Sequence, residues 1–229
     1  MSAVESVAPL CIKLRRHPVC LIVRAVANDD AEIDREEEMD EHSQGAVTAA
    51  ADAGRLAPPR VPPHTIEVPP GHEVFLVGHA VGTQNYICLP SKPPAAGSDW
   101  VLFAPEATLF DHEGLQIVTH FASPSEPGGD PTNPLATWQS KDNSAVWATR
   151  EKSLDSPSGS IPWLLLKVVA ARRGKAGGHR LTKTTYIQRV NTIGGVKPPT
   201  GCAASTDTAN KNFVAYTADY FFYRRAESD

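Results

Sequence analysis

The chain has 229 residues, 41% hydrophobic and 21% charged, a composition ordinary for a globular protein. Its twenty prolines disfavour a helical fold, because proline ends helices and is tolerated mainly in turns and at strand edges. The net charge of −4 belongs to residues 1–60, which hold seven basic and eleven acidic residues, whereas residues 61–229 hold fifteen of each. A neutral domain lacks the basic surface of a nucleic-acid-binding protein. No run approaches the roughly 20 apolar residues of a membrane span.

Residues 1–60 are predicted to be a tail, disordered or removed by processing, with the domain of residues 61–229 following it. Residues 28–42 form a dense acidic run, of the type that repels itself and stays unfolded. Residues 13–27 partly resemble a secretion signal, since basic residues precede an apolar run and a small-x-small pattern. The apolar run is short and Arg24 interrupts its end, so a leader without signal function is the alternative.

From Glu73 onward the sequence is typical of β-strands separated by turns. Strands are expected at 74–81, 100–103, 107–110, 115–121, 162–172, 181–190 and 213–224, with a hairpin over 137–147. Alternation places Val118 and His120 on one face of their strand. About eight strands without an amphipathic helix predict an all-β fold, a single antiparallel β-sandwich or barrel with an extended N-terminal tail.

The most polar stretch attached to an apolar strand is Gln84, Asn85 and Tyr86. Their amide groups and amphipathic ring are suited to a pocket for a polar small molecule or carbohydrate. Other residues predicted to line it are Trp138, Gln188, Arg189 and Asn191. The alternative is structural: the amides satisfy buried backbone groups, and Arg189 pairs with Asp219.

Histidines supply a second hypothesis, in which His120 and His79 hold a metal ion. They lie on different predicted strands, and neither has a partner two residues away that would plant two ligands on one face. A Gly-x-Ser-x-Gly nucleophile motif is absent from the sequence. An enzyme acting on a polar substrate, assisted by such a metal, is therefore the alternative to a binding protein. The sequence assigns neither a cofactor nor an oligomeric state.

Several segments in order along residues 69–223 together resemble the domain-of-unknown-function 3455 family of fungi and bacteria. They are Gly82–Cys88, Pro105–Phe110, Thr119–Phe121, Trp138, Asp142–Ser144, Ile161–Leu165, Ile187–Thr192, Gly194–Gly195, Gly201–Cys202 and Tyr216–Tyr220. Many relatives carry secretion signals, so the resemblance implies an extracytoplasmic or secreted protein.

The resemblance also places Cys88 and Cys202 in recurring segments, which implies a disulfide if the protein is exported. Two buried thiols in a reducing compartment are the alternative. Some fungal members of the family carry a malate-dehydrogenase label. The glycine cluster at 174–178 does not support it, because it lacks G-x-G-x-x-G spacing and lies between two predicted strands.

Overall fold

The computed structural model describes residues 10–12, 19–21, 56–91, 97–125, 129–203 and 210–227. The chain divides into two units, Met1–Thr48 and Ala49–Asp229. In the first unit, β1 (Leu10–Ile12) and β2 (Val19–Leu21) pair antiparallel. The rest of the predicted tail before residue 56 lies outside the described residues. In the part of the chain that is described, no helix has the length and apolar character needed to cross a membrane.

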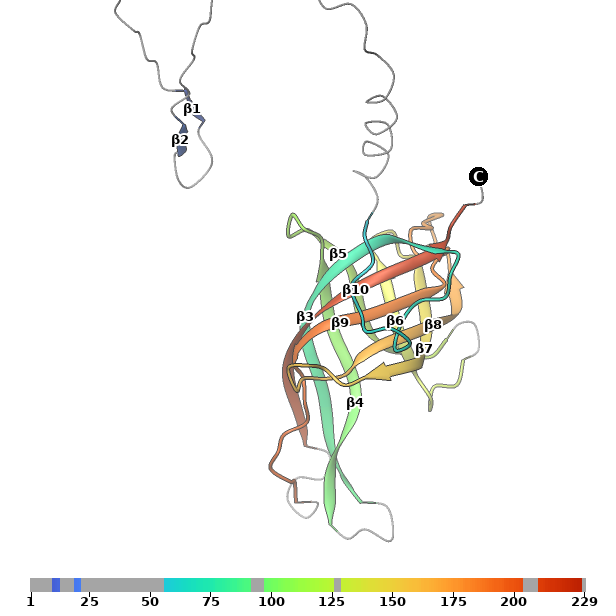
Figure 1. Cartoon of the computed structure of the whole chain (residues 1–229). Helices are drawn as coiled ribbons and strands as arrows, with labels where there is room; N and C mark the ends of the chain where they lie inside the picture. The colour runs from blue at the N-terminus through green and yellow to red at the C-terminus, as the bar shows by residue number, and fades with distance from the viewer. Residues whose placement is uncertain are drawn as a thin grey trace, which may run out of the picture. The chain divides into compact units, whose positions relative to one another are not determined.

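The second unit contains eight strands that form a closed barrel (Figure 1). They are β3 (His72–Pro90), β4 (Ser98–Phe110), β5 (Gln116–Ser123), β6 (Leu135–Ser140), β7 (Ala145–Leu154), β8 (Trp163–Arg172), β9 (Tyr186–Gly194) and β10 (Lys211–Arg225). Each strand pairs antiparallel with the next in the chain, and β10 also pairs with β3 to close the ring. The all-β prediction is confirmed, and the barrel is the correct one of its two architectures.

Strand β4 is continuous, whereas the sequence predicted two short strands separated at Pro105. The described pairing of β5 with β4 covers only residues 107–110, so Pro105 pairs with β3 on one side alone. A proline is tolerated there because its missing N–H falls on an unpaired edge. The register also shifts after Asn85, so that Leu102 rather than Phe103 lies opposite Tyr86. This β-bulge brings Leu102 to the face that Tyr86 occupies.

Strand β9 begins at Tyr186, later than the expected start at residue 181. Residues 179–185 form turns instead, in which Leu181 is fully buried and its backbone N–H donates to Ser144 Oγ. The apolar side chain of Leu181 therefore packs into the core without belonging to a strand. Its burial explains why an apolar pattern extended the predicted strand too far.

Part of the barrel wall carries buried apolar side chains on both faces. The inner cluster combines β3 and β10 residues such as Leu76, Ala80 and Phe222 with residues from the other strands. On the outer face, Ile66 packs with Leu165 and Val190, while other apolar side chains of residues 61–68 cover β8, β9 and β10. We call residues 61–68 the lead-in segment; Figure 1 shows it crossing the outside of the barrel. Where the lead-in segment covers the wall, both faces are buried, so strand alternation alone does not distinguish inside from outside there.

Candidate functional site

The barrel encloses a cavity of about 500 Å³. Every one of the eight barrel strands contributes at least one residue to its lining, which places it inside the barrel. Half of the lining residues are buried, whereas Leu102, Pro134, Thr149 and Arg150 are exposed and mark the side open to solvent. The interior of an eight-stranded barrel either fills with side chains or holds one small ligand. This barrel has room for a ligand.

One wall of the cavity is aromatic. His120 on β5 and Trp138 on β6 are register partners, and their rings stack with centroids 4.2 Å apart and planes 10° apart. Tyr220 on β10 packs against both rings, at 5.5 Å from His120 and 5.8 Å from Trp138. Cross-strand pairing thus fixes the position of this aromatic cluster.

His120 is neutral and offers an acceptor nitrogen. Its Nδ1 lies 2.9 Å from the carbonyl oxygen of Thr137, so Nδ1 carries the proton and donates. Burial lowers the pKa of His120 to about 3, against the opposing effect of this hydrogen bond and with a further lowering by the charge of Arg189. The Nε2 atom therefore bears a lone pair, and no described residue hydrogen-bonds to it.

Two buried donors of the cavity lining lack partners. Among the described residues, Gln84 Nε2 and Trp138 Nε1 make no hydrogen bond, although Gln84 is only 3% exposed and Trp138 only 1%. Burial raises the pKa of the Tyr216 hydroxyl, and the nearby Gln84 amide offsets part of that rise. The Gln84 Nε2 atom nevertheless does not reach hydrogen-bonding geometry. Buried polar groups normally have partners, so two unsatisfied donors beside one cavity need an explanation.

Arg189 on β9 completes the polar lining. Its Nε and Nη2 atoms donate to the backbone oxygen of Pro162, at 3.2 and 2.8 Å. The predicted alternative, a pair with Asp219, does not form. Asp219 instead accepts from Asn191 and contacts His79 Nδ1 at 2.7 Å. The guanidinium of Arg189 is thus held by a neutral carbonyl group.

A loop segment passes beside the cavity and is anchored to Tyr86. The Tyr86 hydroxyl donates to the backbone oxygen of Gly195 at 2.7 Å. Gly195 has a φ of +76°, and a Cβ there would lie 3.0 Å from Tyr216 and 3.1 Å from Gln84 Cγ. Glycine is required because the chain turns left-handed directly against lining residues. Burial raises the pKa of Tyr86, while the charges of Arg189 and Lys197 partly offset that rise.

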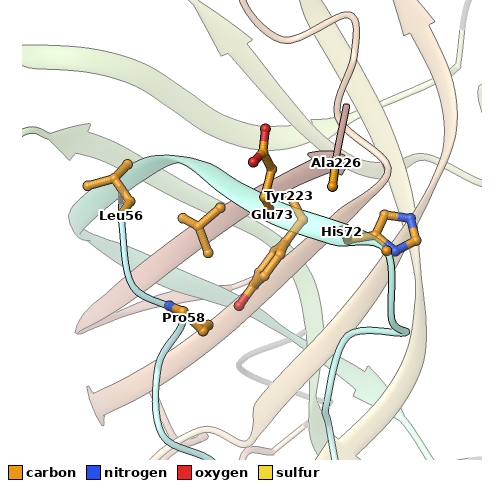
Figure 2. Close-up of a pocket in the computed structure, with 8 residues that line it drawn as sticks. Leu56, Pro58, His72, Glu73, Tyr223 and Ala226 are labelled. Atoms are coloured by element: carbon orange, nitrogen blue, oxygen red, sulfur yellow. The ribbon is translucent and has the colours of Figure 1, made fainter. Parts of the chain in front are cut away.

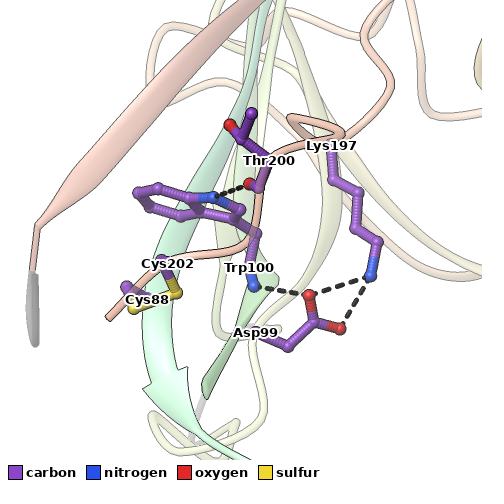
Figure 3. A network of polar contacts seen from close by, with 6 residues as sticks. All are labelled: Cys88, Asp99, Trp100, Lys197, Thr200 and Cys202. Carbon is purple, nitrogen blue, oxygen red and sulfur yellow. Dashed lines mark hydrogen bonds and ion pairs between the residues drawn. A yellow bond between two sulfur atoms is a disulfide. The ribbon is translucent and has the colours of Figure 1, made fainter. Parts of the chain in front are cut away.

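Residues 195–203, which we call the anchored loop, are attached to β3 and β4 by the contacts in Figure 3. Cys202 forms a disulfide with Cys88 across 114 residues, as the family resemblance implied. Lys197 Nζ pairs with Asp99 at 2.7 Å, and Trp100 Nε1 donates to the Thr200 oxygen. The hydrogen bond from Lys197 lowers the pKa of Asp99. These contacts fix the loop that carries Gly195.

The structure brings Gln84, Tyr86, Trp138 and Arg189 together, with His120 among them. Three other predicted residues lie elsewhere. Asn85 accepts a hydrogen bond from Thr83 on the opposite face of β3 from Gln84. Gln188 donates to the backbone oxygen of Ile66 on the outer face, and Asn191 bonds to Asp219.

The two histidines proposed as metal ligands are not brought together. His79 has an exposed side chain and pairs with Asp219, whereas His120 is buried in the cavity lining. No cluster of three or more His, Cys, Asp or Glu side chains suited to a metal ion occurs within the described residues.

Sequence reasoning missed Tyr220 and Pro162. Tyr220 shares the alternating face of Tyr216 and Ala218, a signal that identifies a buried face but not a cavity. Pro162 contributes its carbonyl group, and no side-chain pattern reports the position of a backbone acceptor.

A second pocket, of about 320 Å³, lies between residues 56–58, the start of β3 and the end of β10 (Figure 2). The Tyr223 side chain reaches toward Pro58 there, and its hydroxyl donates to Gln188 Oε1. Arg224 pairs with Glu73 at 2.8 Å. Because these polar groups already have partners, the barrel cavity is the stronger candidate site.

The fold and cavity together define an eight-stranded antiparallel up-and-down barrel with an internal binding-sized space. The chain belongs to the family described as "Protein of unknown function (DUF3455)", whose model matches residues 69–224. That match spans all eight barrel strands but for the last residue of β10. No curated protein matches the chain, and no solved structure matches it either.

Proposed function

We propose that this protein binds one polar small molecule or carbohydrate unit inside the barrel. The observation that carries the proposal is a 500 Å³ cavity lined by Gln84 and Trp138, whose side-chain donors Nε2 and Nε1 are buried without hydrogen-bond partners in the described residues. A ligand oxygen would satisfy such donors, whose desolvation is otherwise uncompensated. His120 Nε2 adds an acceptor for a ligand hydroxyl group.

We further propose an extracytoplasmic setting. The Cys88–Cys202 disulfide supports it, because disulfides persist mainly in oxidising compartments. Immunodetection in culture medium and cell fractions, with the thiol state of both cysteines measured in each, tests this part. Protein confined to a reducing compartment with free thiols would contradict it.

Binding is tested by a thermal-shift screen of monosaccharides and small polyols, followed by calorimetry. A ligand that binds the native state raises the melting temperature in proportion to the logarithm of its concentration over Kd. We expect Gln84→Leu to weaken a hit at least tenfold, since one hydrogen bond in a desolvated site is lost. Gln116→Leu is the matched control, because Gln116 is exposed at the start of β5. Equal weakening by both variants, or no hit at all, would refute the proposal.

A further inference from the structure

Arg189 is the buried charged residue of the cavity lining, and no acidic side chain among the described residues pairs with it. It is 8% exposed and lines the cavity from β9. Its Nε and Nη2 atoms share one backbone oxygen, that of Pro162, and no described carboxylate forms an ion pair with it. A guanidinium group has five N–H donors, so a single carbonyl oxygen leaves most of them available. The carbonyl group of Pro162 is also neutral, so it does not cancel the positive charge of Arg189.

The surroundings of Arg189 do not cancel it either. The cavity lining contains no Asp or Glu, and its only other formally charged residue is Arg150 at the open side. The charge of Arg189 acts on three neighbouring rings, since it lowers the pKa of His120 and opposes the rise in the pKa of Tyr86 and Tyr216. A buried charge without a partner is unfavourable, and an incoming anion would compensate it.

Much of the remaining cavity lining is apolar. It includes Leu102, Ile161, Leu166 and Leu164, the register partner of Arg189, together with the stacked rings of His120 and Trp138. A ligand that fills this space must therefore present an apolar or ring-shaped body as well as a charged group. One buried guanidinium matches one negative charge, which a carboxylate carries and a phosphate ester exceeds.

We propose that the ligand is a small organic acid or an acidic sugar whose carboxylate pairs with Arg189. This inference rests on the proposed function and narrows its ligand class. Gln84 Nε2 would then donate to a hydroxyl or carbonyl oxygen of the same molecule, and His120 Nε2 would accept from one of its hydroxyl groups. The carboxylate binds while Arg189 keeps its contact with Pro162, because the Nη1 donors are not used by that contact.

The test compares matched probes that differ only in the charged group. Calorimetry with glucuronate against glucose, and with phenylacetate against 2-phenylethanol, measures the contribution of the carboxylate. We expect the acid of at least one pair to bind about tenfold to a hundredfold more tightly, as a charge-assisted hydrogen-bonded pair in a desolvated site allows. Glucose 6-phosphate, which carries a doubly charged group, is expected to bind more weakly than glucuronate.

Variants test whether Arg189 is the residue that recognises the carboxylate. Arg189→Gln should erase the preference for the acid, Arg189→Lys should keep part of it, and Arg225→Gln, an exposed arginine at the end of β10, should leave it unchanged. The comparison of probes on the unaltered protein remains decisive even if Arg189→Gln does not fold. If neutral probes bind the unaltered protein as tightly as the acids, or if Arg189→Gln keeps the preference for the acid, the carboxylate assignment is wrong while ligand binding itself stands. If no probe of either kind binds, the proposed function fails with it.

Discussion

Gln84 and Gln188 are both buried glutamines on strands of the same barrel, one on each face of its wall. Gln188 donates to the Ile66 carbonyl and accepts from the Tyr223 hydroxyl, so both ends of its amide are used beneath the lead-in segment. Gln84 has an amide nitrogen without a partner and lies beside a cavity. The first arrangement is what a folded core requires of a polar group. The second departs from that requirement, and the departure is what identifies a candidate binding site.

The same contrast extends to the surrounding regions. The outer wall is closed by the lead-in segment, whose Ile66 is fully buried against Leu165 and Val190. In the cavity region, Tyr86 hydrogen-bonds to Gly195, and a disulfide joins the anchored loop to β3. Polar groups of the first region stabilise the fold, and several of the second are available to another molecule.

The largest expected effect concerns the disulfide, which belongs to the cavity region. Replacing both Cys88 and Cys202 by Ser should lower the free energy of unfolding by about 4–5 kcal/mol, because a cross-link over 114 residues restricts the unfolded chain. Denaturant titration measures the loss. Reductant should reproduce it in the unaltered protein and add nothing in the double variant. A loss below about 1 kcal/mol would show that the cross-link contributes little to the stability of the fold.

The next prediction tests the two glutamines directly. Gln188→Leu should cost about 3 kcal/mol, because it leaves the Ile66 carbonyl and the Tyr223 hydroxyl buried without partners. Gln84→Leu should cost less than about 1 kcal/mol, since no hydrogen bond of Gln84 Nε2 is lost. Chemical denaturation of both variants measures the difference. Equal costs would mean that Gln84 is a structural residue like Gln188.

A pH titration tests the burial of His120 in the cavity wall. Because its folded pKa is lowered to about 3, the folded protein favours neutral His120, and the unfolded chain takes up the proton first as the pH falls below about 6.5. This contribution is complete above pH 6.5 and should decline by about 2 kcal/mol between pH 7 and pH 5. His120→Phe, which keeps a ring against Trp138, should remove that decline. An unchanged slope in the variant would place the titrating group elsewhere.

The smallest expected effect is the difference in stability lost when either of two tyrosines is replaced by phenylalanine. Tyr223→Phe should cost about 1 kcal/mol, because its hydroxyl is a donor to Gln188 on the closed outer wall. Tyr220→Phe, in the cavity wall, should cost less than half as much, since its hydroxyl meets only that of Tyr216 at 3.3 Å. Thermal denaturation of the two variants compares them. If Tyr220→Phe lost more stability than Tyr223→Phe, the hydroxyl in the cavity wall would be the structural one, contrary to the contrast drawn between the two regions.

Most of the strand pattern was predictable, because alternation and turn residues are local properties of the chain. Val118 and His120 share a strand face as predicted, and the hairpin over 137–147 turns at Asp142 and Asn143 between β6 and β7. The errors lie where distant strands decide the outcome. Pro105 lies within a strand because β5 does not pair beside it, and Leu181 is buried in a turn because it packs into the inner core.

The sequence by itself determined the all-β class, the approximate number of strands and the choice of Gln84, Tyr86, Trp138 and Arg189 as candidate residues. Only the tertiary structure decided between sandwich and barrel, since closure depends on β10 pairing with β3 more than a hundred residues away. It also decided which polar residues are satisfied. Gln84 and Gln188 are indistinguishable as residue types, and their difference arises because a backbone carbonyl from Ile66 reaches one of them and a cavity adjoins the other.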